Sequence, residues 1–392
     1  MGNVSNRVLY IISLNHATND GSVYLLSSLF PIVLSLFDIS VFQVGVIVAV
    51  GYSVNVLFQP VVGHFSEGKD PGKFLATGMA FIAVSAVSFI FSTGFLSLLA
   101  SVVVLRLGSS FFHPVGISAV SKTYNGPGLQ RAMGFQSAFG NLGVLLTFVS
   151  AAPLYLAVGW RSTFLVFAIW TIVDIITTLR LLGPRNLANS GSSNRASESV
   201  GSTRIPAFYV IVAFVSGGSY AVVLNFANIF LGSKTQLNVS QVNLIVSAFI
   251  GFAFLGALAT GSWSRVLPTN VLLAVFYLIA SAAMTGFVLL AGNVLEGAFA
   301  LVATGFAISS TYPLTYTSLS NFLSSSNHQR TGESFGVLSS GQTIGASSLG
   351  LVSGYVSQFF GLEAAFFMIA VLTVVGSFST VIWIRTSRAK GL

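Results

Sequence analysis

Cysteine and charged side chains are what this sequence lacks. It has no cysteine, which excludes disulfide bonds and thiolate metal ligands. Charged residues make up only 7% of the 392 residues, against about a quarter in ordinary soluble domains. Apolar residues account for 54%, and the mean hydropathy is +0.87. This composition excludes an ordinary water-soluble globular protein, so we expect a membrane protein that crosses the bilayer many times.

Long apolar runs follow one another along the whole sequence. A run of about 20 mainly apolar residues is long enough to cross the hydrocarbon core as a helix. We find twelve such runs, at residues 8–36, 41–64, 73–92, 95–121, 131–157, 161–182, 207–231, 240–263, 269–291, 295–322, 331–358 and 362–384. The sequence therefore predicts an all-α membrane protein with twelve transmembrane helices, here called spans 1 to 12.

Basic residues fall almost entirely on one side of these spans. Arg161 and Lys234 lie on one side, and Arg106 lies within span 4. The other side holds Arg7, Lys69, Lys73, Lys122, Arg131, Arg180, Arg185, Arg195, Arg204, Arg265, Arg330, Arg385, Arg388 and Lys390. Lysine and arginine are enriched in cytoplasmic loops, so we expect both termini in the cytoplasm. We also expect the chain to lie in the plasma membrane. The net charge of +8 then reflects orientation, and we expect no nucleic-acid partner.

The sequence divides into two halves of similar length. Residues 183–206 are rich in serine, asparagine, glycine and arginine and predict a cytoplasmic linker between bundles 1–182 and 207–392. A shift of 199 positions places His113-Pro114 on Tyr312-Pro313, and a shift of 198 places Gly63 on Gly261. A shift of 200 places Asp38-Ile39-Ser40 on Asn238-Val239-Ser240. These matches predict two six-helix bundles related by a repeat.

Span 1 carries a dense polar cluster in residues 15–21, which read NHATNDG. His16 and Asp20 are four residues apart and therefore share one helical face. Burial favours a neutral carboxylic acid, whereas a cationic neighbour favours the carboxylate, so we expect Asp20, helped by His16, to take up and release a proton. Asn19 is expected to contact the solute. The alternative is a hydrogen-bonded packing cluster that never titrates.

Span 4 contains a positive charge inside an apolar run. Placing Arg106 near the bilayer centre costs about 2.5 to 3.5 kcal/mol, so we expect it to face protein or a wet cavity. Arg106, Ser110 and His113 recur at i, i+4 and i+7, which places them on one face. Pro114 should weaken the helix just beyond them. We expect these three side chains to bind the solute.

Polar side chains in other spans complete a predicted solute cavity. They are Asn141 in span 5, Asn225 in span 7, and Tyr312 and Tyr316 in span 10. Aromatic rings with hydroxyls and amides suit an amphipathic solute. Hydrogen bonding between helices is the alternative for each of them.

Charged residues near the cytoplasmic ends of spans suggest a gate. Gly63 lies at the end of span 2, Lys69 lies in the turn that follows it, and Glu333 follows Arg330 by three residues at the start of span 11. We expect these four residues to take part in gating. A solvated loop is the alternative for the turn after span 2.

One further carboxylate lies within a span. Asp174 is in span 6, and Arg180 follows it at the cytoplasmic end of the same span. Two interpretations stay open for Asp174: an ion pair or snorkelling towards Arg180, and a proton-carrying role.

Glycines are concentrated in spans 5 and 11. The spacing of small residues there predicts close approach of helix backbones. Static packing and sliding of these faces during a conformational change both stay open. The residues are Gly134, Gly140 and Gly143 in span 5, and Gly336, Gly341, Gly345, Gly350 and Gly354 in span 11.

Twelve spans, a repeat of six plus six and a basic central loop resemble the major facilitator superfamily. Within it, residues 13–20 (SLNHATND), 59–63 (QPVVG), 108–114 (GSSFFHP) and 139–143 (FGNLG) resemble the fosmidomycin-resistance group of efflux proteins. The resemblance implies the major facilitator fold and a proton-coupled exporter, with His16, Asp20 and His113 as its polar core. The sequence departs from the group at Val115, where the group has an acidic residue, and from the superfamily motif at Ser66, where aspartate is favoured. Together with Arg106, these departures suit an organic anion.

We therefore expect a secondary transporter that exports a small organic anion, amphipathic solute or drug by proton antiport. Proton-coupled uptake of an organic anion by symport uses the same parts and stays open, as does a non-transporting receptor or scaffold. An enzyme is not expected, because no G-x-S-x-G or H-E-x-x-H motif is present. The four histidines, at positions 16, 64, 113 and 328, have no metal-site spacing, although His16 and His113 can meet in three dimensions. We expect no cofactor, no metal, and a monomer whose partners are the solute, protons and the lipid bilayer.

Overall fold

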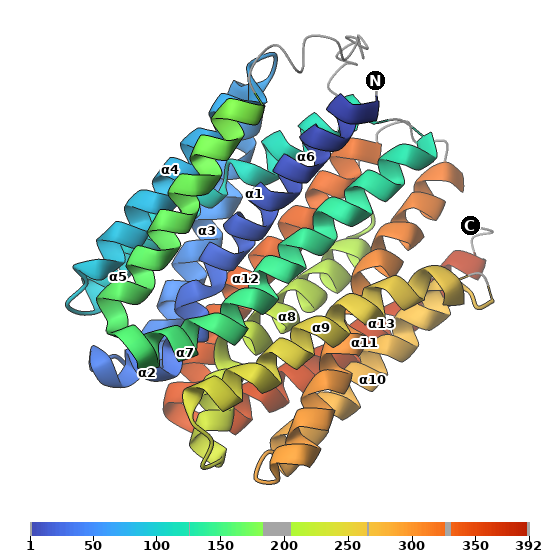
Figure 1. Cartoon of the computed structure of the whole chain (residues 1–392). Helices are drawn as coiled ribbons and strands as arrows, with labels where there is room; N and C mark the ends of the chain where they lie inside the picture. Colours follow the sequence, from blue (N-terminus) through green and yellow to red (C-terminus); the bar gives the residue numbers. More distant parts are fainter. Residues whose placement is uncertain (1, 125, 183–204, 265, 326–330, 390–392) are drawn as a thin grey trace. The chain divides into compact units, whose positions relative to one another are not determined.

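The structure, a computed structural model, describes residues 2–124, 126–182, 205–264, 266–325 and 331–389, which form helices and short turns (Figure 1). The helices are α1 (Gly2–Ser28), α2 (Phe30–Leu36), α3 (Val41–Ser66), α4 (Pro71–Ile90), α5 (Phe95–Ser109), α6 (Phe112–Thr123), α7 (Gly126–Leu181), α8 (Ala207–Lys234), α9 (Val239–Trp263), α10 (Thr269–Leu290), α11 (Val294–Ser325), α12 (Thr331–Phe360) and α13 (Leu362–Ala389). Helices satisfy their own backbone hydrogen bonds, which is what an apolar bilayer demands.

Every predicted span is occupied by helix. Among the described residues, nine helices are long and apolar enough to cross a membrane. The helix α7 counts once among them although it covers predicted spans 5 and 6, and the more polar α1 and α12 are not among the nine. The chain is therefore an all-α, multi-pass membrane protein.

Two helix interruptions have clear local causes. Gly159 divides α7, because its φ of 78° lies in the left-handed region that glycine adopts without strain. In span 4, α5 ends at Ser109 and α6 begins at Phe112. Pro114 has no N–H to offer the Ser110 carbonyl four residues earlier, and the amide of Phe111 turns back to the Gly108 carbonyl at 3.1 Å. The interruption therefore precedes His113. The sequence had predicted that it would follow His113.

The chain separates into two compact units. Unit 1 contains Met1–Leu29, Ser35–Ile39 and Ser53–Ser199, and unit 2 contains Phe30–Leu34, Ser40–Tyr52 and Val200–Leu392. The predicted linker, 183–206, lies almost entirely outside the described residues, so the sequence boundaries of the two bundles stay a prediction.

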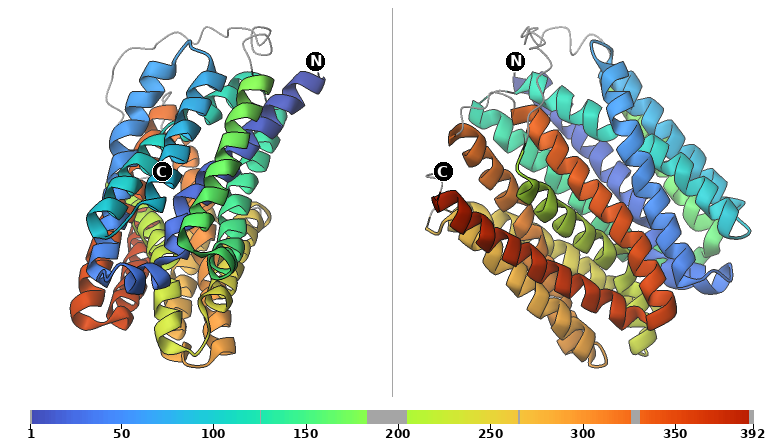
Figure 2. Two further views of the ribbon diagram at one scale, coloured as in Figure 1. Left: turned by 60° about the vertical axis from the view of Figure 1, so that its left-hand side comes forward. Right: turned by 180° about the vertical axis from the view of Figure 1, so that it is seen from behind.

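Helix packing follows the same scheme in each unit. In unit 1, α1 packs along α7, and α4 packs on α5 and α7 (Figure 1). In unit 2, α8 packs along α12, and α10 packs on α11 and α13 (Figure 2). These pairs are equivalent by their order along the chain. The pair of spans 1 and 5 corresponds to the pair of spans 7 and 11, and the pair of spans 3 and 6 corresponds to the pair of spans 9 and 12. The repeated packing agrees with a repeat of six plus six helices.

The helix N-termini refine the register of this repeat. At the start of α3, the Ser40 amide donates to Gln43 Oε1 at 2.8 Å, and the Gln43 amide donates to Ser40 Oγ at 3.2 Å. At the start of α9, the amides of Asn238 and Gln241 make the same reciprocal bonds, both at 3.0 Å. Both are capping boxes. Asn238 thus takes the place of Ser40, a shift of 198 instead of the 200 suggested by the sequence comparison around Asp38.

Candidate functional site

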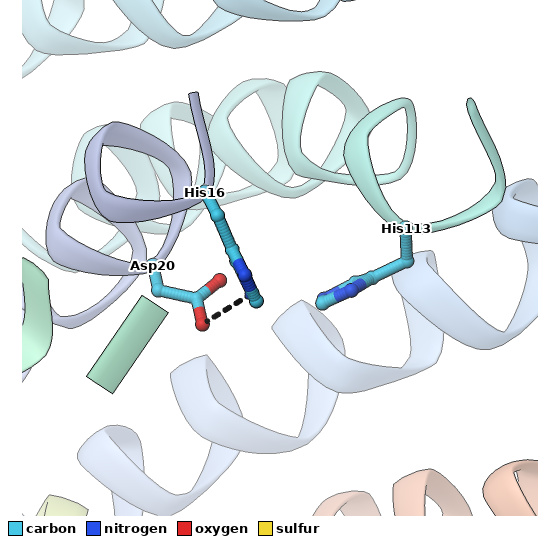
Figure 3. A group of neighbouring side chains, drawn as sticks. All are labelled: His16, Asp20 and His113. Atoms are coloured by element: carbon cyan, nitrogen blue, oxygen red, sulfur yellow. Dashed lines mark ion pairs between the residues drawn. The ribbon is translucent and has the colours of Figure 1, made fainter. Parts of the chain in front are cut away.

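Two histidines and one aspartate converge in unit 1 (Figure 3). His16 and Asp20 extend from one face of α1, and His113 points towards them from the start of α6. His16 Nε2 lies 3.1 Å from Asp20 Oδ2. One nitrogen of each histidine and one oxygen of Asp20 all lie within 4.8 Å of one another. We call these three residues the His–Asp–His cluster.

The ring of His16 is held from three directions. Its Nδ1 lies 2.8 Å from the carbonyl oxygen of Gln136 on α7, and this oxygen accepts hydrogen bonds only. The proton must therefore be on Nδ1, which leaves Nε2 facing Asp20. Phe112 stacks on the ring with centroids 4.4 Å apart, and a Cβ added at Gly140 would lie 2.6 Å from Nε2. The close packing of α1 on α7 thus fixes both the tautomer and the direction of His16.

Asp20 is more accessible to solvent than His16. Its side chain is 23% exposed, against 9% for His16. Asn19 donates from Nδ2 to Asp20 Oδ1 at 2.8 Å, so each carboxylate oxygen has a neighbour. A neutral His16 would present a lone pair to a carboxylate at 3.1 Å, which is repulsive. The contact is therefore favourable only when a proton or another cation lies between the two groups.

Arg106 lies in a polar network within unit 1. It is only 7% exposed, and its Nη1 donates to Asn55 Oδ1 on α3 at 3.2 Å. Asn55 Nδ2 donates to Ser110 Oγ at 3.4 Å, and Ser110 Oγ donates to the Arg106 carbonyl at 2.8 Å. Ser110 is thus near Arg106, as the i, i+4 spacing indicates. His113 instead lies near His16 and Asp20.

Asp174 is buried at 1% exposure and accepts a hydrogen bond from Asn15 Nδ2 at 2.7 Å. Asn15 Nδ2 also donates to Thr178 Oγ1 at 2.8 Å. The contacts of Asp174 therefore lie across the helix interface with α1, in place of the pairing with Arg180 considered from the sequence. Two neighbouring residues of α1 therefore contact different carboxylates: Asn15 contacts Asp174, and His16 contacts Asp20.

The solute-binding residues predicted in the second half of the chain lie in unit 2. Asn225 is 1% exposed and donates from Nδ2 to the Ala221 carbonyl of its own helix at 2.7 Å. Tyr312 packs edge-on against Tyr220 with ring centroids 6.0 Å apart. Tyr316 donates from its hydroxyl to Gln342 Oε1 on α12 at 3.4 Å. Both tyrosines lie on α11, four residues apart.

The remaining predicted site residues are more scattered. Asn141 is half-buried, and its Nδ2 lies 3.4 Å from the Ser137 carbonyl of its own helix. A Cβ added at Gly63 would lie 3.4 Å from Pro114 Cβ, while Lys69 is exposed over the rings of Phe65 and Phe74. Arg330 and the side chain of Glu333 lie outside the described residues, so the predicted gate pair stays untested.

Two contributors to these networks were missed from the sequence. Asn55 is a lone amide in the apolar run Val54-Asn55-Val56-Leu57, and that isolation was a usable signal. The contribution of Gln136 is a backbone carbonyl, which carries no side-chain signature, so only the packing of α7 on α1 reveals it.

Comparisons with known proteins agree with this architecture. The sequence profile described as Major Facilitator Superfamily matches residues 12–330 and, in a second match, residues 209–391. The fosmidomycin resistance protein of Escherichia coli is 26% identical over 263 residues. That match covers 65% of this chain and 63% of the relative, just under two thirds of its length.

Solved structures are similar over nearly the whole chain. A bacterial homolog of the human lysosomal transporter Spinster, in an inward-facing and occupied conformation, superposes with a TM-score of 0.79 at 16% identity. It covers 97% of this chain and 96% of that one. A mutant of the nucleoside transporter NupG gives a TM-score of 0.76 at 13% identity, covering 97% and 99% of the two chains. At these identities the likeness concerns the fold.

Proposed function

Because the chain belongs to the major facilitator superfamily, and is thus a multi-pass membrane transporter of small molecules and not an enzyme, we propose a proton-coupled mechanism for it. In this proposal it exports a small organic anion or amphipathic drug by antiport with protons across the plasma membrane. It works as a monomer with both termini in the cytoplasm, and the two bundles alternate access to a central site.

The observation that carries the proposal is the contact between His16 and Asp20. The Gln136 carbonyl holds the proton of His16 on Nδ1, so Nε2 and the carboxylate at 3.1 Å compete for one further proton. A site of this kind changes its charge by one unit when it loads or releases a proton. The side chain of Asp20 is 23% exposed, and this partial exposure supports its assignment as the group that exchanges the proton.

A proton crossing a potential of about 100 mV releases about 2.3 kcal/mol, enough for a solute gradient of several tens-fold when one net charge moves per cycle. One proton per cycle at Asp20 is therefore sufficient to drive accumulation of a solute against its gradient.

The solute side of the proposal assigns anion binding to Arg106 and His113, with Asn19, Ser110 and Asn141 near them in unit 1. Arg106 is buried with the amide of Asn55 and supplies a permanent positive charge inside the bundle. In unit 2, Asn225, Tyr312 and Tyr316 supply the amphipathic lining. Gly63, Lys69, Arg330 and Glu333 are proposed to act in the cytoplasmic gate.

Transport in proteoliposomes with an imposed pH gradient tests this function, with fosmidomycin and small carboxylates as probes. Antiport predicts that solute accumulates when the interior is acidic, because protons leaving drive solute in. Accumulation with an acidic exterior would instead mark symport. Protein-free liposomes report passive partition of weak acids, and uptake independent of both gradients would contradict proton coupling.

A further inference from the structure

The His–Asp–His cluster offers a second chemistry besides proton exchange. Its three members provide two imidazole nitrogens and one carboxylate oxygen, all within 4.8 Å of one another. The side chains come from two helices and point towards a common centre (Figure 3). The sequence spacing of the histidines gave no indication of a metal site, because the cluster forms only when α1 and α6 meet.

The distances suit coordination of a metal ion with little movement. In a tetrahedral site with bonds of about 2.0 to 2.1 Å, neighbouring ligand atoms are roughly 3.3 Å apart. His16 Nε2 and Asp20 Oδ2 already lie 3.1 Å apart. The nitrogen of His113 must therefore approach by roughly 1.5 Å at most, a displacement that side-chain rotation can supply.

His16 also has the outer support that metal-binding histidines need. Such a histidine usually donates its other ring N–H to a carbonyl or carboxylate, which fixes the tautomer and directs the lone pair at the ion. Here Nδ1 donates to the Gln136 carbonyl at 2.8 Å, and Phe112 stacks on the ring at 4.4 Å. The lone pair of Nε2 is thus aimed at the centre of the cluster before any ion arrives.

We propose that His16, Asp20 and His113 form a binding site for a borderline transition-metal ion of the Zn²⁺ type. Imidazole nitrogens favour zinc and its neighbours over magnesium and calcium, which take oxygen ligands. Three protein ligands leave a fourth position for water. An ion there occupies the lone pairs that the proposed proton uses, so the site gives divalent metal a direct means of blocking the transporter. The binding itself does not depend on the transport proposal.

Titration of the purified full-length protein with Co²⁺, in detergent and without a polyhistidine tag, tests the site. We expect one Co²⁺ per chain, with the visible absorption bands of tetrahedral coordination, and displacement by Zn²⁺. His16→Ala and His113→Ala should each weaken binding at least roughly tenfold, the size of effect seen when metal-site support is lost.

Two further variants separate loss of the site from loss of folding. His64→Ala/His328→Ala removes the other two of the four histidines and should bind like the wild type. Gly140→Ala retains all three ligands but places a Cβ 2.6 Å from His16 Nε2, so it should also lose Co²⁺ while eluting as a single species on gel filtration. Absence of the bands in the wild type, undiminished binding in His16→Ala or His113→Ala, or loss in the double variant would overturn the proposal.

Discussion

His16 illustrates how a single residue can be specified by backbone as much as by side chains. Its two ring nitrogens face different partners, the Gln136 carbonyl on one side and Asp20 on the other. The sequence was sufficient to pair His16 with Asp20, because two residues four positions apart on a helix share one face. It was not sufficient to find Gln136, since a carbonyl contribution depends only on how α7 lies on α1.

Gly140 is the position at which an added side chain would disturb this arrangement most directly. A Cβ there would lie 2.6 Å from His16 Nε2 and 2.9 Å from Asp20 Oδ2. Gly140→Ala should therefore displace the pair and abolish pH-driven transport in proteoliposomes. Gly134→Ala, on the same helix with nothing within 4 Å of its Cβ position, is the control and should transport normally. Equal transport by the two variants would show that the His16–Asp20 contact is dispensable.

At the scale of helices, glycine contacts define the tightest pairings in both units. A Cβ at Gly143 on α7 would fall on the Ala17 carbonyl of α1, and one at Gly345 on α12 would fall on the Phe214 carbonyl of α8. The glycine-rich patterns of spans 5 and 11 predicted close approach but not the partner helix. Partner choice depends on the topology of the whole bundle, which a single pattern of small residues does not encode.

These contacts predict a stability effect that is the same in both units. Gly143→Ala and Gly345→Ala each force a methyl group against backbone that cannot rotate away, which should cost roughly 1 to 3 kcal/mol and lower the melting temperature in detergent. Gly134→Ala and Gly336→Ala have no atom within 4 Å of the added Cβ and serve as matched controls. If all four variants melt together, the close helix approach is not limiting for stability.

Helix interruptions were harder to predict than helices. Pro114 signalled a weak point, but its effect appears one turn earlier, at Ser110 and Phe111, because the lost hydrogen bond belongs to the carbonyl four residues before it. The capping boxes at Ser40 and Asn238 likewise identify the repeat register more sharply than residue identity did.

At the scale of the whole molecule, the apolar composition and the succession of long apolar runs were enough to predict an all-α membrane protein, and the family agrees with that prediction. The solute and the ion cannot be predicted in this way, because they depend on a few side chains from spans distant in sequence. His113 joins His16 and Asp20 only in three dimensions, and Asn55, 51 residues before Arg106 in the chain, meets it only through the fold.

The orientation of the chain is also a whole-molecule property. The distribution of lysine and arginine predicts cytoplasmic termini, and the absence of cysteine makes the prediction simple to test. Ser192→Cys, in the predicted linker, should resist a membrane-impermeant maleimide added to intact cells. Gly292→Cys, exposed between α10 and α11, should react. The reversed labelling pattern would place the termini outside.

The coupling role of Asp20 is tested most directly by Asp20→Asn in proteoliposomes, with exchange and pH-driven accumulation of the same solute measured side by side. Glu67→Gln, an exposed carboxylate after α3, is the control. We predict that Asp20→Asn still exchanges solute across the membrane but no longer accumulates it in response to a pH gradient. Accumulation by Asp20→Asn at the wild-type level would contradict the proposal that Asp20 carries the proton.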